Sequence, residues 1–139
     1  MTKTYELRRL ILSEILDRWT DKKGRWSWNK DGSVDVEGYV LVESESKMSK
    51  LPVKFRNVAE FFCCEGLGLE TLEGCPDNVG SWFSCADNNL TSLDYLSIIH
   101  EEGSINVARN KKSFTKEEVL KIRPNCPVVY TDDNYQDWF

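Results

Sequence analysis

The stretch LETLEGCPDNVGSWFSCADNNLTSLDYL, residues 69–96, contains one pattern twice. LETLEG is followed 21 residues later by LTSLDY, and FCCEGLG, residues 62–68, is followed at the same distance by FSCADNN. The frame extends upstream and downstream of these two copies. The apolar and cysteine positions that share it are Val40, Val42, Met48, Leu51, Val58, Phe62, Cys64, Leu69, Leu72, Val79, Phe83, Cys85, Leu90, Leu93, Ile105 and Val107.

A period of 21 to 22 residues with leucines at L-x-x-L spacing is typical of a leucine-rich-repeat-like solenoid. Each unit would form a short strand, a turn and a return segment, and it would bury its apolar side only by stacking on its neighbours. We therefore expect about four turns whose strands stack in parallel. Alternation along the strand predicts that Phe62 and Cys64 point inward while Phe61, Cys63 and Glu65 point outward.

The two ends predict caps that would close this solenoid, giving an α+β fold in a single domain, residues 1–139. Residues 1–38 would form the N-terminal helix and strand cap, 39–112 the repeats and 113–139 the C-terminal cap. Residues 5–20 have apolar side chains at helical spacing, and the capping box of Thr115 and Glu118 opens a second helix. Strand-like segments are 26–28, 34–36 and PVVYTDD, residues 127–133. The helix residues expected to face the core are Leu12, Ile15, Leu16 and Trp19, with Leu7 and Ile11 beside them.

The string LEGCPDNVGSWFSCADNNLTSL, residues 72–93, resembles the repeats of short leucine-rich-repeat proteins of tailed bacteriophages. The segment WSWNKDGSVDVEGYVLVESESKMSKLPVKFRNV resembles the part of those proteins that precedes the first repeat, so the resemblance covers residues 26 to about 114. The chain departs from the family at Gly66-Leu67-Gly68 and at SLDYLSIIHEEG, residues 92–103. The resemblance implies protein–protein interaction, offers no catalytic residues, and implies a phage protein acting in a bacterial host cytoplasm.

The charge of the chain is unevenly distributed around its net value of −5. Residues 1–30 contain eight Lys and Arg against four Asp and Glu, whereas residues 57–108 contain nine acidic residues and no Lys or Arg. Nucleic-acid binding requires a basic footprint, so this pattern argues against it and favours a partner with a basic surface. The alternative is an acidic surface that serves only solubility.

Outward strand positions of successive turns form rows, because neighbouring strands lie about 4.8 Å apart. The first row, Tyr39, Phe61 and Trp82, predicts an aromatic stripe of the kind found at interface cores. Its alternative is that the N-terminal helix, or Tyr135 and Trp138, cover it. The candidate partner-binding residues are Tyr39, Leu41, Glu43, Phe61, Cys63, Glu65, Trp82 and Ser84.

Catalytic, metal and cofactor sites are not indicated. Five cysteines without a CxxC pair, and one histidine, do not match zinc-ligand spacing, and disulfides are not expected in a reducing compartment. His100 beside Glu101 lacks a third catalytic group, and the acidic neighbours of Cys63 would raise its pKa. No apolar run approaches about 18 residues and the N-terminus lacks a secretory pattern, so we expect a cytoplasmic protein without membrane contact.

The sequence thus predicts a non-enzymatic protein-binding module, a phage accessory protein that modulates a host protein with a basic surface, for example as an anti-defence or toxin-inhibiting factor. Two alternatives stay open. One is a self-associating structural or interaction protein, a homo-oligomer paired through the aromatic stripe or an end strand. The other is an enzyme of unrecognised class that depends on His100 or Cys63.

Overall fold

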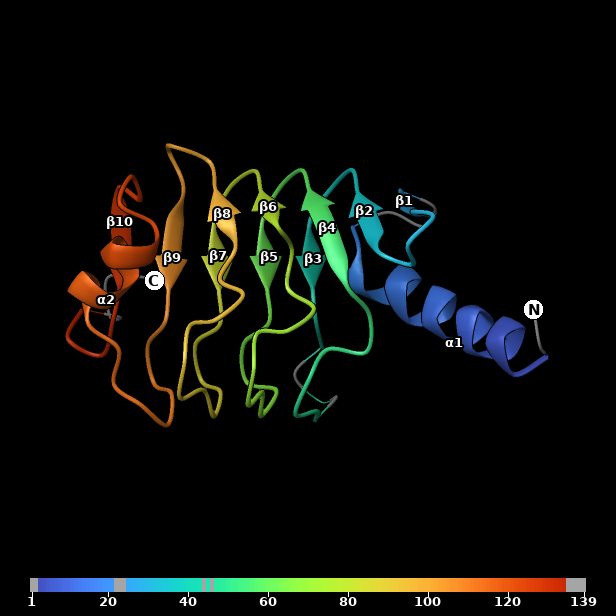
Figure 1. Ribbon diagram of the computed structural model, residues 1–139, viewed down its shortest axis with the longest axis horizontal. Coiled ribbons are helices and arrows are strands. Elements are labelled where there is room, and N and C mark those ends of the chain that lie inside the picture. Colours follow the sequence, from blue (N-terminus) through green and yellow to red (C-terminus); the bar gives the residue numbers. More distant parts are fainter. Residues whose placement is uncertain (1–2, 22–24, 44, 46, 135–139) are drawn as a thin grey trace.

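A computed structural model describes residues 3–21, 25–43, 45 and 47–134 of the 139-residue chain. The protein is a β-solenoid of about four turns with parallel strands and two helices (Figure 1). The turns follow one another along the long axis of the molecule, and α1 (Lys3–Trp19) projects from the N-terminal end of this stack. Each turn crosses from one sheet to a second sheet and back.

The first sheet contains the strands that the repeat predicts. In spatial order its strands are β10 (Val128–Tyr130), β9 (Ser104–Asn106), β7 (Phe83–Ser84), β5 (Phe62–Cys63) and β3 (Val40–Leu41). All four pairings are parallel, and Phe62 lies opposite both Val40 and Phe83, while Phe83 lies opposite Ile105. The predicted period of 21 to 22 residues is therefore the pairing register of β3, β5, β7 and β9.

The second sheet lies along the return segments. In spatial order it contains β1 (Trp26–Trp28), β2 (Val34–Val36), β4 (Phe55–Val58), β6 (Asn78–Val79) and β8 (Ile98–Ile99). The β1–β2 pair is an antiparallel hairpin, and the later pairs are parallel. The predicted strand-like segments 26–28 and 34–36 are confirmed as β1 and β2, and Val58 pairs with Val79, which shares its repeat position. The strands β6 and β8 are not predicted by the sequence, because two residues are too short to display an alternating pattern.

The core lies between the two sheets and is built from equivalent positions of successive turns. Phe62 and Phe83 are fully buried and their rings stack with centroids 5.8 Å apart, while Phe55 meets Phe62 edge-on at 5.2 Å. Cys64, predicted to point inward, and Cys85 at the equivalent repeat position are also fully buried, and each thiol donates to a backbone carbonyl of the next turn. The stacking of turns thus supplies the wall that a single turn lacks.

The side chain of Asn88 joins the loops that follow β5 and β7 in two adjacent turns. The Asn88 side-chain oxygen accepts hydrogen bonds from the backbone N–H groups of residues 67, 68 and 69, each at 3.0 Å. Its amide nitrogen donates to the carbonyls of residues 64, 85 and 86. Asn110 repeats this arrangement one turn later, since its side chain accepts from Leu90 N–H and donates to the carbonyls of residues 85, 107 and 108.

The backbone repeats its left-handed positions along with the turns. Gly66, Asp87 and Arg109 occupy equivalent loop positions with φ of 69°, 59° and 55°. Gly74 and Tyr95 form a second such pair, with φ of 99° and 70°. A side chain on Gly74 would meet the Val53 carbonyl oxygen at 2.9 Å, whereas Tyr95 points outward and is 60% exposed. The turn that replaces GCP after β7 thus keeps the backbone path of the earlier turn without its glycine.

The two helices lie at opposite ends of the solenoid (Figure 1). In α2 (Lys116–Ile122), the predicted capping box is confirmed, since the Thr115 hydroxyl accepts from Glu118 N–H and the Glu118 carboxylate accepts from Thr115 N–H. In α1, Leu16 and Trp19 are buried, but Leu7 is exposed, so its predicted place beside the core is wrong. The same correction applies to Ile11.

The exposure of Leu7 and Ile11 has a geometric cause, because helical spacing places them on the side of α1 opposite the buried Leu16. Within the part of the chain that the structure describes, neither helix combines the length and the apolar character needed to cross a membrane.

Candidate protein-binding surface

Three aromatic rings form a continuous stack on the outside of the first sheet. Tyr39, Phe61 and Trp82 each precede the first residue of β3, β5 and β7, so the parallel register places them one above another. The rings of Tyr39 and Phe61 are 4.6 Å apart with planes 6° from parallel, and those of Phe61 and Trp82 are 4.3 Å apart and 3° from parallel. We call these three residues the aromatic stack.

The aromatic stack is half-buried at each of its three members. Much of this burial comes from the rings themselves, because each stacked pair covers the facing surfaces of its two members. The N-terminal helix does not cover Phe61 or Trp82, since α1 projects away from β5 and β7 (Figure 1). Tyr135 and Trp138, the other expected covers, lie outside the described residues. The parts of the three rings that are not stacked on one another therefore leave apolar surface exposed on the outward face of the first sheet.

The second predicted row is mostly closed. Leu41 is 49% exposed, whereas Cys63 and Ser84 are buried although they occupy outward register positions of β5 and β7. The Ser84 hydroxyl donates a hydrogen bond to the Glu65 carboxylate of the preceding turn. Neighbouring side chains on the same sheet face therefore cover this row, and only Leu41 offers its side chain to a partner directly.

The third row places carboxylates beside Leu41. Glu43 and Glu65 are half-buried, and together with Glu45 they surround an open hollow of about 340 Å³ whose lining includes Leu41 and Cys63. The hollow lies two residues further along β3 and β5 than the aromatic stack, on the same outward face. The aromatic stack and the acidic residues of the third row therefore lie on one surface.

The thiol of Cys63, the candidate nucleophile on this surface, is buried. Burial, followed by the neighbouring Glu65 carboxylate, raises the pKa of the Cys63 thiol from 9.0 to about 11, so the sulfur is protonated at neutral pH. His100 lies elsewhere, in the exposed loop after β8, where its Nδ1 accepts the backbone N–H of Glu102. No group of three metal-ligating side chains is found among the described residues.

Sequence reasoning missed a second exposed apolar group. Leu7, Leu10 and Ile11 of α1 are 58%, 60% and 50% exposed. Helical spacing places all three on the side of α1 opposite Leu16. The sequence contains a signal for this group, because residues 5–20 contain more apolar side chains than one helix face can bury.

Comparisons with known proteins identify no relative. No protein-family model matches the chain, and no curated protein or solved structure is significantly similar to it.

Proposed function

We propose that this protein is a non-enzymatic protein-binding module whose binding surface is built on the aromatic stack. The observation that carries the proposal is the half-buried stack of Tyr39, Phe61 and Trp82 on an outward strand face. Rings held by neighbouring turns lose little conformational freedom when a partner covers them, and aromatic side chains are enriched at the energetic centres of interfaces. Leu41 extends this apolar surface along β3.

The partner in this proposal has a basic surface. Glu43, Glu45 and Glu65 stand around the hollow next to Leu41, where three carboxylates outnumber the one cation described nearby, Lys47, whose Nζ donates to the Gly66 carbonyl. A Lys or Arg side chain could place its aliphatic part against Leu41 and its charge among these carboxylates. Such a contact would speed association at low salt and weaken as salt screens it.

We further propose that the solenoid is of the leucine-rich-repeat type and that its ends act as caps. The inward hydrogen bonds of Asn88 and the buried leucines of the period support the first part. Leu16 and Trp19 at the N-terminal end, and Val119 of α2 at the other, support the second, because they bury apolar surface that a further turn would otherwise cover.

The biological setting of the proposal rests on the resemblance to phage repeat proteins. In that setting the protein acts in a bacterial host cytoplasm as an accessory factor that binds and modulates a host protein. An anti-defence factor or a toxin inhibitor fits best, since nucleases and other nucleic-acid-binding proteins present the basic surface that this charge pattern would recognise.

The test is affinity capture from bacterial lysate with four proteins: wild type, Phe61→Ala/Trp82→Ala, Glu43→Lys and Tyr95→Ala. We expect one basic protein to be retained by wild type and by Tyr95→Ala, which removes an exposed aromatic outside the stack. The double variant and Glu43→Lys should lose it while their unfolding transitions show that they are folded. Capture that is indifferent to both variants, or unchanged between about 50 and 500 mM salt, would contradict the proposal.

Self-association is the second candidate function, and the exposed face of α1 favours it. Leu7, Leu10 and Ile11 lie on one side of the helix, where a second copy could cover them. Sedimentation velocity should then show a concentration-dependent dimer that Ile11→Glu removes. A single monomeric species at several hundred micromolar would exclude this candidate.

A further inference from the structure

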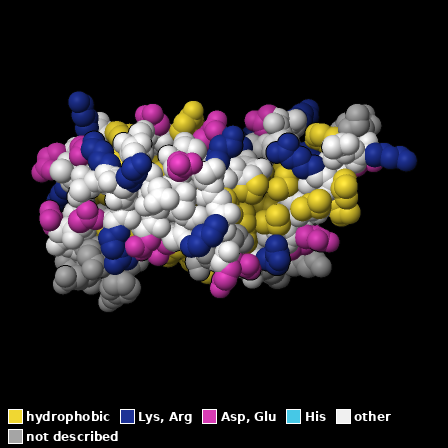
Figure 2. Space-filling view, turned by 90° about the horizontal axis from the view of Figure 1, so that it is seen from below, with side chains coloured by type: hydrophobic (Ala, Val, Ile, Leu, Met, Phe, Trp, Pro, Cys, Tyr) yellow, Lys and Arg dark blue, Asp and Glu magenta, His cyan; other side chains and the backbone are white. Residues whose placement is uncertain are grey.

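A groove lies between α1 and the chain segment that leads into β4. Two adjoining hollows of about 200 and 380 Å³ make up this groove, and both are lined by Arg8 and by residues 52–54. Seen from below, hydrophobic side chains gather at the end of the molecule that carries α1, with Lys and Arg around them (Figure 2). The groove is distinct from the aromatic stack in place and in charge.

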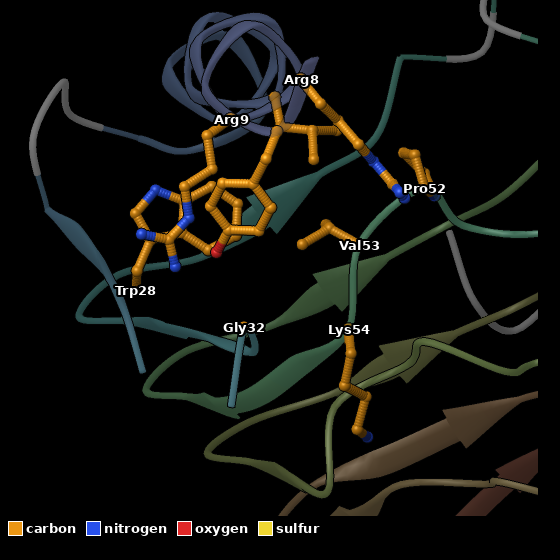
Figure 3. Close-up of a pocket in the computed structure, with 9 residues that line it drawn as sticks. Arg8, Arg9, Trp28, Gly32, Pro52, Val53 and Lys54 are labelled. Atoms are coloured by element: carbon orange, nitrogen blue, oxygen red, sulfur yellow. The ribbon is translucent and has the colours of Figure 1, made fainter. Parts of the chain in front are cut away.

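The centre of the groove is apolar. Val53 lies between the helix and Lys54 in Figure 3, and Leu12 and Pro52 continue the lining. Val53 is buried, whereas Leu12 and Pro52 are half-buried, so the lining keeps some apolar surface in contact with solvent. The ring of Trp28 closes the groove on the side towards β1.

Two arginines border this apolar centre, and neither has a carboxylate partner among the described residues. The Arg9 guanidinium lies over the Trp28 ring at 4.5 Å and the Tyr5 ring at 5.5 Å. Arg8 makes no hydrogen bond or ion pair with any residue that the structure describes. Ion pairing occupies the other two cations of the groove, since Lys50 contacts Glu73 at 3.0 Å and Lys54 contacts Asp77 at 2.8 Å. The unpaired positive charge is therefore concentrated at Arg8 and Arg9.

The directions of the two side chains restrict the anion that they can bind. In Figure 3 Arg9 extends towards Trp28 and Arg8 extends the opposite way, towards Pro52. Because the two guanidinium groups point away from each other, they cannot both contact one small dianion such as phosphate. They can pair with two carboxylates that stand on either side of an apolar side chain, and stacking on Trp28 leaves the in-plane N–H groups of Arg9 able to donate.

We propose that this groove binds an extended acidic segment of a partner protein. In such a segment alternate side chains share one face, so a pattern Glu-x-Leu-x-Glu would direct all three side chains into the groove. The leucine would cover Val53 and Leu12, and the two carboxylates would pair with Arg8 and Arg9. Residues 1–30 contain eight basic and four acidic residues, so their net positive charge would attract an acidic segment. This inference is independent of the aromatic stack, because it concerns the opposite sign of charge at another surface.

The experiment is an amide-resolved NMR titration of the full 139-residue chain with the peptide acetyl-Glu-Ser-Leu-Ser-Glu-amide. We expect shift changes confined to residues around the groove, with weak but saturable binding. The matched peptide acetyl-Gln-Ser-Leu-Ser-Gln-amide should bind at least about tenfold more weakly, since hydrogen bonds to charged groups are the stronger ones. This comparison uses wild-type protein alone and does not depend on the folding of any variant.

Two protein variants locate the effect. Arg8→Gln should weaken binding of the acidic peptide about tenfold, and it should fold normally because Arg8 has no partner among the described residues. Arg18→Gln removes the same charge from an exposed position of α1 outside the groove and should change binding less than about twofold. The proposal is overturned by equal binding of the two peptides, by equal effects of the two variants, by shifts spread over the acidic turns, or by inorganic phosphate shifting the same residues as strongly as the peptide.

Discussion

The most demanding prediction concerns Asn88, whose side chain joins the loops of two adjacent turns. Replacing it by alanine removes the one oxygen that accepts from the N–H groups of residues 67, 68 and 69. It also removes the donors to the carbonyls of residues 64, 85 and 86, at 2.8, 3.0 and 3.2 Å. Asn88 is only 5% exposed, so water would not readily replace these bonds.

The magnitude follows from the number of groups left without a partner. Each buried backbone group that loses its hydrogen bond costs about 1–3 kcal/mol. The six contacts do not add in full, because three N–H groups share one oxygen and residue 68 is half-buried. We therefore expect Asn88→Ala to lower the free energy of unfolding by about 4 kcal/mol, which corresponds to a fall of roughly 10–15 °C in Tm for a domain of this size.

Urea unfolding, followed by circular dichroism, measures this change. Asn89→Ala is the matched control, since Asn89 is exposed and no hydrogen bond of its side chain is found among the described residues, and it should change the unfolding free energy by less than about 0.5 kcal/mol. If Asn88→Ala came within about 1 kcal/mol of Asn89→Ala, the idea that one buried amide joins the loops of two adjacent turns would be wrong.

Three further predictions address the turns, the C-terminal helix and the thiols. Tyr95→Gly should stabilise the protein by about 0.5–1 kcal/mol in urea unfolding, because glycine removes the strain of a left-handed tyrosine and little packing is lost at an exposed side chain; no gain would contradict this. Thr115→Ala should lower the free energy of unfolding in urea by about 1 kcal/mol, because the N-cap hydrogen bond of α2 is lost. An unchanged free energy of unfolding would show that packing alone holds α2. Cys63 should react with iodoacetamide at pH 8 about 100-fold more slowly than in urea, because its pKa is raised to about 11; rapid native alkylation would show an open thiol.

The stability of the protein should depend on pH through Glu118 of helix α2, and the sign of this dependence follows from the pKa of its carboxyl. Hydrogen bonding to Lys112, and then to Thr115 N–H, holds the pKa of the Glu118 carboxyl below its ordinary value. A depressed pKa contributes stability above the unfolded value of about 4.3, and this contribution is lost as pH falls through the folded pKa. Unfolding midpoints measured between pH 3 and 6 should therefore fall less steeply for Glu118→Gln than for wild type. Parallel curves would show that the ion pair has no influence.

The parts of the fold that the sequence predicts are those that repeat. Phe62 and Phe83, or Cys64 and Cys85, are visible as signals because stacking forces equivalent positions to satisfy the same packing requirement. The aromatic stack follows from the same rule, since a register that aligns Phe62 with Phe83 must align the residues before them. Burial of Cys63 and Ser84 could not be predicted this way, because it depends on what neighbouring side chains cover.

The ends of the chain were harder to predict because no repeat constrains them. The apolar spacing of α1 indicates a helix, but it does not show which apolar side meets the solenoid, and the prediction for Leu7 and Ile11 is wrong for this reason. The groove beside Arg8 and Arg9 depends on the angle between α1 and the first turn. That angle is a tertiary property, set where Leu16 and Trp19 meet the core.

The register has a consequence for how the chain folds. Val40 pairs with Phe62, Phe62 with Phe83 and Phe83 with Ile105, which are 22, 21 and 22 residues apart. Each new turn therefore closes a loop of nearly the same length, and no pairing of these strands needs a long excursion of the chain. Folding can begin at whichever turn is most stable locally and spread to both sides one closure at a time. A defect in one turn then halts growth in a single direction while the other side completes.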